Sequence, residues 1–87
     1  MMFEEYDVVK LLENTAVNWD GELVQLTSGL SGTILGVAKD QKSFLVEFTT
    51  DEGETIAMVP IEKRLLELVW KASTRSYVDS RSEKTAS

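Results

Sequence analysis

Short segments with alternating apolar residues run through this chain, and their period limits its fold more than any other feature. Residues 43–49 show the pattern best, because Phe44, Val46 and Phe48 recur at every second position. A period of two is typical of a β-strand with one face against a core. Similar segments lie at residues 7–12, 32–38, 54–59 and 65–70. The sequence therefore predicts five short strands and a mainly β fold.

Turn-forming residues separate these segments. Asp40-Gln41-Lys42 is short enough to join the second and third strands as a hairpin, and Asp51-Glu52-Gly53 does the same for the third and fourth. Gly53 suits a left-handed turn position. Pro60 has no N–H to donate, so the fourth strand is expected to end there. Residues 61–64 predict one tight 3-10 turn before the last strand, and a helix over residues 61–68 is the alternative.

A chain of 87 residues allows one domain. Residues 1–70 are predicted to form a small, partly open antiparallel barrel of five strands, with residues 13–31 as a long first connection. That connection contains a turn at Asn18-Trp19-Asp20-Gly21 and a candidate extra strand at residues 23–27. Residues 71–87 are rich in serine and poor in large apolar side chains, so they predict a flexible polar tail.

Composition excludes several kinds of chemistry. The chain has no cysteine and no histidine, so disulfides, thiolate metal sites and Ser-His catalytic triads are excluded. A net charge of −6 argues against a surface that neutralises phosphates. The acidic start does not resemble a signal peptide, and the apolar runs are too short to span a bilayer. We therefore expect a cytoplasmic protein that does not associate with membranes.

Three fragments in order carry a resemblance to a known family. They are Asp7-Val8-Val9-x-Leu11, then Gly29-x-x-Gly32-Thr33-Ile34, then Val46-Glu47-Phe48-x-x-Asp51-x-Gly53-x-Thr55-x-Ala57. Over about residues 4–70 the chain resembles an uncharacterised family of small bacterial proteins, a domain of unknown function. The resemblance implies an SH3-like barrel related to KOW motifs and to the nitrile hydratase β-subunit, and it supplies no catalytic residue.

The family context and two departures from its pattern also bear on function. Family members often lie beside mobile or accessory genes, so the resemblance implies an accessory or antitoxin-like role. This chain departs from the pattern by an insertion around residues 17–27 and by its serine-rich tail.

Three candidate chemical sites each have a structural alternative that we favour. Gly29-Leu30-Ser31-Gly32 is neither a nucleophile elbow nor a phosphate loop, and a tight turn explains its glycines. The acidic cluster Asp51, Glu52 and Glu54 does not have the spacing of an EF-hand loop, so we predict a solvated hairpin tip and no bound metal. Glu47 and Glu67 are predicted to face outward. No catalytic residue and no cofactor are expected.

Interaction surfaces are the remaining candidates. More apolar residues are present than a small barrel can bury, and alternation places Leu45, Ala57, Val59 and Val69 on outward faces. Trp19 is either an exposed binding residue or, as we favour, a cover over the open end of the barrel. Trp70 is expected in the core. The residues predicted to take part in interactions are Trp19, Leu45, Val59 and Trp70.

The predicted function is that of a small, acidic, non-catalytic interaction module that self-associates. Its charge favours a basic protein partner. The alternative is a weak nucleic-acid-binding module of the KOW type, and it is disfavoured because the basic side chains are scattered among acids. Those of the barrel are Lys10, Lys39, Lys42, Lys63 and Arg64.

Overall fold

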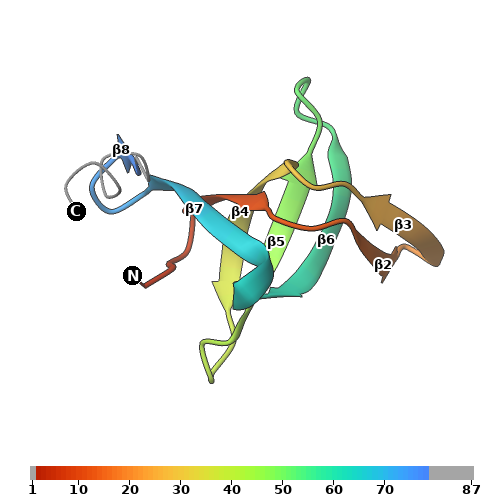
Figure 1. Ribbon diagram of the computed structural model, residues 1–87, viewed down its shortest axis with the longest axis horizontal. Helices are drawn as coiled ribbons and strands as arrows, with labels where there is room; N and C mark the ends of the chain where they lie inside the picture. Colours follow the sequence, from red (N-terminus) through yellow and green to blue (C-terminus); the bar gives the residue numbers. More distant parts are fainter. Residues whose placement is uncertain (1, 79–87) are drawn as a thin grey trace.

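The computed structural model describes residues 2–78 and shows a mainly β protein (Figure 1). Six strands form an antiparallel sheet in the order β6-β5-β4-β1-β7-β8, and β2 and β3 form a separate two-stranded sheet. The elements in chain order are β1 (Val8–Leu11), β2 (Thr15–Trp19), β3 (Glu22–Leu26), β4 (Ser31–Val37), β5 (Ser43–Thr49), β6 (Thr55–Glu62), the 3-10 helix η1 (Lys63–Leu65), β7 (Leu66–Lys71) and β8 (Ser76–Tyr77). Within residues 2–78, no helix has the length and apolar character needed to cross a membrane.

The five predicted strands correspond to β1, β4, β5, β6 and β7, and the predicted 3-10 turn is confirmed as η1. The prediction of a five-stranded barrel is wrong in two respects. Eight strands are present in the described part of the chain, and β6 and β8 are the edge strands of the larger sheet, each paired on one side only. The barrel is therefore not closed. The helical alternative for residues 61–68 is also wrong, because strand structure lies on both sides of η1.

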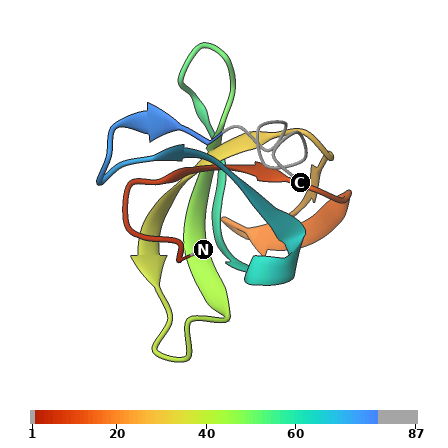
Figure 2. The same ribbon diagram turned by 60° about the vertical axis from the view of Figure 1, so that its left-hand side comes forward.

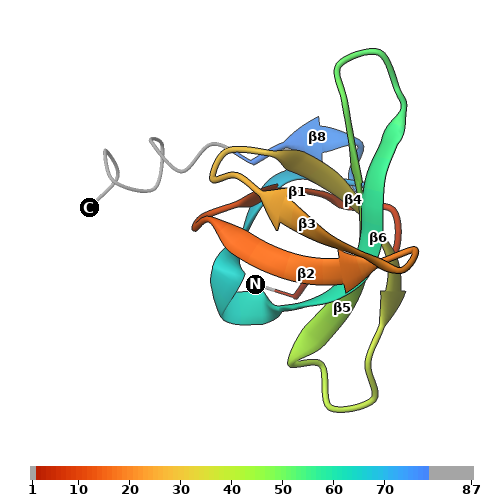
Figure 3. The same cartoon turned by 90° about the vertical axis from the view of Figure 1, so that its right-hand side faces the viewer.

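Residues 15–26, inside the predicted long connection, form a hairpin of their own. Trp19 pairs with Glu22 in the β2–β3 ladder, so Asp20 and Gly21 alone make the turn. Both have positive φ, 55° and 77°, which is the geometry of a type I′ hairpin turn. Figure 3 shows this hairpin beside β6, and Val17 is among its side chains that pack on the core.

The core lies between the curved sheet and this hairpin. Phe44, Val46 and Phe48 are buried, as predicted. Antiparallel partners share a face of the sheet, so the residues of β6 opposite them are buried too: Ile61, Val59 and Ala57. The prediction that Ala57 and Val59 face outward is therefore wrong. A register shift between Phe48 and Thr49 decides which residues of β6 face the core. The alternation of apolar residues in the sequence does not reveal this shift.

Pro60 does not end β6, which continues to Glu62. The proline lies opposite Leu45 and is exposed, on the outermost strand of the sheet. An edge strand tolerates proline because the missing N–H faces away from the neighbouring strand. The prediction failed because a missing N–H ends a strand only where that N–H would have to donate to a neighbouring strand.

The predicted tail falls partly inside the described residues. Lys71 ends β7, and after a turn β8 pairs back onto β7, with Tyr77 opposite Trp70. The remaining part of the predicted tail, residues 79–87, lies outside the described residues.

Candidate functional site

The first candidate surface is an exposed apolar patch on the outer side of β5 and β6. Leu45 in β5 lies opposite Gly36 of β4 and opposite Pro60 of β6. Met58 is two positions before Pro60 in β6, so it lies on the same face of the sheet. Leu45 is 37% exposed and Met58 is 38% exposed. We call this surface, made of Leu45, Met58 and Pro60, the apolar outer face. A shallow hollow of about 270 Å³ adjoins Leu45 and Pro60.

The four predicted interaction residues do not gather at one site. Leu45 lies on the apolar outer face as expected, whereas Val59 is only 5% exposed and belongs to the core. Trp19 is half-buried and packs on the core from the end of β2, a position that favours the covering role. Trp70 is also half-buried, and it lies beside Tyr77 outside the buried core cluster, so the expectation of a core position is wrong.

The glycine motif is structural, as predicted. Gly29 has a φ of 95° in the turn that leads to β4. Gly32 is packed so closely that a Cβ there would lie 2.5 Å from Cγ1 of Val46. The acidic residues Asp51, Glu52 and Glu54 are exposed on the β5–β6 turn. Within residues 2–78, no three Asp or Glu side chains are grouped closely enough to hold a metal ion.

Glu47 and Glu67 are half-buried on their strands and take part in ordinary surface contacts. Glu47 accepts a hydrogen bond of 2.6 Å from the hydroxyl of Thr55. Glu67 forms an ion pair of 3.5 Å with Lys10, and both side chains are more than 40% exposed. These contacts explain both carboxylates as surface groups of the sheet.

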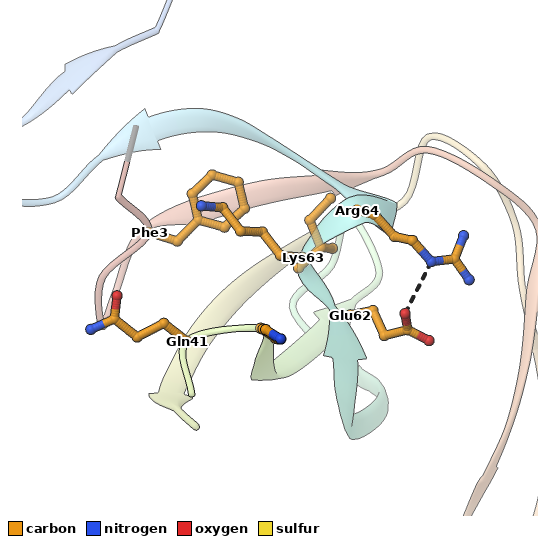
Figure 4. Close-up of a pocket in the computed structure, with 7 residues that line it drawn as sticks. Phe3, Gln41, Glu62, Lys63 and Arg64 are labelled. Carbon is orange, nitrogen blue, oxygen red and sulfur yellow. Dashed lines mark hydrogen bonds and ion pairs between the residues drawn. The ribbon is translucent and has the colours of Figure 1, made fainter. Parts of the chain in front are cut away.

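The second candidate surface is a groove of about 650 Å³ at the end of the β5–β6 pair. Figure 4 shows Phe3 and Lys63 on one side of it and Gln41 on the other. Three basic side chains line the groove, namely Lys42, Lys63 and Arg64, so we call it the cationic groove. The remaining lining residues are Phe3, Gln41, Glu62 and Leu66. The sequence analysis treated these basic residues as scattered among acids, and 21 positions separate Lys42 from Lys63 in the chain.

The fold brings the two basic segments of the groove together. The backbone N–H of Lys63 donates to the carbonyl of Lys42 over 2.8 Å, which joins η1 to the β4–β5 turn. Arg64 Nε donates to Glu62 over 3.0 Å, and its side chain stays 67% exposed. Among residues 2–78, neither Lys42 nor Lys63 forms an ion pair with a carboxylate. An acidic protein therefore keeps two lysines uncompensated at one site.

Phe3, one wall of the groove, is held by a partly buried ion-pair network that the sequence analysis missed. Lys71 Nζ donates to Oδ2 of Asp7, to Oε1 of Glu4 and to the carbonyl of Met2, at 2.7–2.8 Å. Asp7 is fully buried and also accepts from the backbone N–H groups of Glu4 and Ala72. We call these contacts the Lys71 clasp. They fix the N-terminal segment that carries Phe3, whose ring packs 5.3 Å from that of Phe44.

Electrostatics strengthen the clasp. Burial alone would raise the pKa of Asp7, but hydrogen bonds from Lys71, Ala72 and Glu4 outweigh it and hold that pKa below its ordinary value of 3.8. Burial alone would lower the pKa of Lys71, but Asp7 and Glu4 raise it above its ordinary value of 10.5. Both groups are therefore charged at neutral pH. A carboxylate with a lowered pKa and three hydrogen bonds is a poor general base.

Residues 5–68 match the model of a protein family described as a domain of unknown function (DUF4926). The matched span includes the apolar outer face and the three basic residues of the cationic groove. It begins after Phe3 and ends before Lys71. No curated protein and no solved structure matches the chain significantly.

Proposed function

The chain belongs to the DUF4926 family, whose description assigns no activity, and on that premise we propose that it is a non-catalytic interaction module that self-associates through the apolar outer face. The observation that carries this proposal is the cluster of Leu45, Met58 and Pro60 on one exposed side of the sheet. Apolar side chains gathered in this way lose contact with water when a second surface covers them.

The edge strand β6 is a poor site for pairing with a strand of a second molecule, and this favours contact through the apolar outer face instead. Pro60 lies on the outermost strand and has no N–H, so an incoming strand would lack one ladder hydrogen bond there. A twofold contact that places the same apolar face against itself needs no such ladder. The SH3-like relationship, the bacterial origin, the cytoplasmic location, a basic protein partner and an accessory or antitoxin-like role are part of the same proposal.

Sedimentation velocity on matched variants tests self-association. Leu45→Glu places a charge in the apolar outer face, and we expect it to weaken self-association at least about tenfold, because an unpaired charge would be desolvated at the contact. Leu23→Glu is the control, since Leu23 is 64% exposed on β3, away from this face. Equal association of the two variants, or a monomeric native protein at tens of micromolar, would show that the apolar outer face is not the contact.

A further inference from the structure

We propose that the cationic groove is a docking site for the acidic turn of a second copy of this chain, so that copies join head to tail. The acidic turn is the β5–β6 connection and carries Asp51, Glu52 and Glu54. Three carboxylates of one copy then face the three basic side chains that line the groove of the next. This inference rests on the proposed self-association and adds a second contact to it.

The backbone of the acidic turn is held by hydrogen bonds within the turn. Gly53 has a φ of 88°, and its N–H donates to the carbonyl of Thr50 over 2.9 Å. The hydroxyl of Thr50 accepts from the N–H groups of Glu52 and Glu54, at 3.3 and 3.1 Å. Binding therefore orders few additional backbone groups, which lowers its entropic cost.

The position of the two surfaces requires a second copy. Figures 1 and 2 show the β5–β6 turn projecting from one end of the molecule and the β4–β5 turn, which carries Gln41 and Lys42, projecting from the other end. The acidic turn of one copy cannot reach its own groove. A contact between two different surfaces is heterologous, so it produces rings or open chains rather than a closed pair.

Several features of the groove favour a carboxylate-bearing turn over a nucleic acid. Single-stranded nucleic acids bind by stacking bases on exposed aromatic faces. Phe3 is only 8% exposed, and its ring packs against Phe44. Lys63 Nζ lies 5.3 Å from the centroid of the Phe3 ring. A long polyanion would also extend beyond the groove onto a protein of net charge −6. A short turn places its charge only within the groove, where the local field is cationic.

Charge-reversed variants that restore association when mixed test this contact. Both are made in the Leu45→Glu background, where the apolar outer face does not contribute. The first carries Asp51→Lys, Glu52→Lys and Glu54→Lys, and the second carries Lys42→Glu and Lys63→Glu. Each variant alone has like charges on turn and groove, so it is expected to be monomeric. The mixture has opposite charges in both pairings, and we expect it to associate at least about tenfold more tightly than either variant alone.

A control separates the position of the charges from their number. Glu5→Lys, Glu13→Lys and Glu22→Lys change the same number of exposed carboxylates away from the acidic turn. Alone in the Leu45→Glu background, this control keeps the native turn and the native groove, so it is expected to associate as the Leu45→Glu parent does, whereas the turn variant of equal net charge is expected to be monomeric. Equal association of the control and the turn variant would overturn the proposal. Circular dichroism confirms that each variant is folded.

Two further outcomes would also overturn the inference. One is a mixture that stays monomeric at tens of micromolar while both variants are folded. The other is a single-stranded oligonucleotide that binds the native chain and not the groove variant, with no association in the mixture, because that pattern assigns the groove to nucleic acid. Neither result depends on the apolar outer face, whose contribution is measured separately with Leu45→Glu.

Discussion

Replacing Asp7 with alanine is expected to remove a large part of the stability of the protein. The buried carboxylate accepts hydrogen bonds of 2.8 Å from Lys71 Nζ and from the N–H groups of Ala72 and Glu4. Alanine removes the acceptor of all three donors and leaves Lys71 with Glu4 as its remaining carboxylate. Removing one partner of a buried ion pair costs about 3–5 kcal/mol. That is a large share of the roughly 5–15 kcal/mol by which a domain is stable.

Urea unfolding at neutral pH, followed by the fluorescence of Trp19 and Trp70, measures this loss. Glu67→Ala is the control, because the Lys10–Glu67 pair is exposed and is expected to contribute less than about 1 kcal/mol. Asp7→Asn keeps one oxygen acceptor and should fall between the two variants. If Asp7→Ala destabilised the protein no more than Glu67→Ala does, the Lys71 clasp would not be a major source of stability.

The remaining predictions concern pH and backbone geometry. Because the pKa of Asp7 is lowered on folding, its stabilisation is present above about pH 4 and is lost as the pH falls through the folded pKa. The free energy of unfolding of the native protein should therefore fall over this acidic range, which urea titrations at decreasing pH measure. Because the pKa of Lys71 is raised, its contribution is present below about pH 10.5 and is lost as the pH rises through the folded value, which alkaline urea titrations measure. Gly32→Ala should cost about 1–3 kcal/mol by overpacking, and Gly36→Ala, whose Cβ would have 3.7 Å of clearance, should cost less in the same urea assay. Gly53→Ala should cost about 1–2 kcal/mol in thermal unfolding, because its φ is 88°.

Strands with one clear apolar phase could be predicted from the sequence. Residues 43–49 were predicted with the bounds that β5 has, because Phe44, Val46 and Phe48 leave only one inward face. In β6 both faces carry apolar residues, so alternation does not show which face is buried. One face has Ile56 and Met58, and the other has Ala57 and Val59. The register shift that places the second pair in the core lies at the end of β5, next to the β5–β6 turn. The β2 strand was missed because Trp19 was assigned to the turn, although Asp20-Gly21 is a strong two-residue hairpin signal.

The candidate site was less predictable, because its parts are distant in sequence. Leu45 could be placed on an exposed face by alternation alone. The cationic groove needs the β4–β5 turn, η1 and Phe3 to meet, and no local pattern indicates that. Lys71 looked like the first residue of a polar tail, yet its carboxylate partner Asp7 lies 64 positions earlier. Only the central position of β1, between β4 and β7, brings the two together.

That position of β1 has a consequence for how the chain is made. A ribosome releases β1 first, but its second neighbour, β7, is synthesised only after every strand from β2 to β6. Until Lys71 emerges, Asp7 has no cation to accompany it into the interior, and burying it alone would be costly. The nascent chain is thus kept from completing its core early, and products terminated before residue 71 are expected to be recognised as unfolded and degraded.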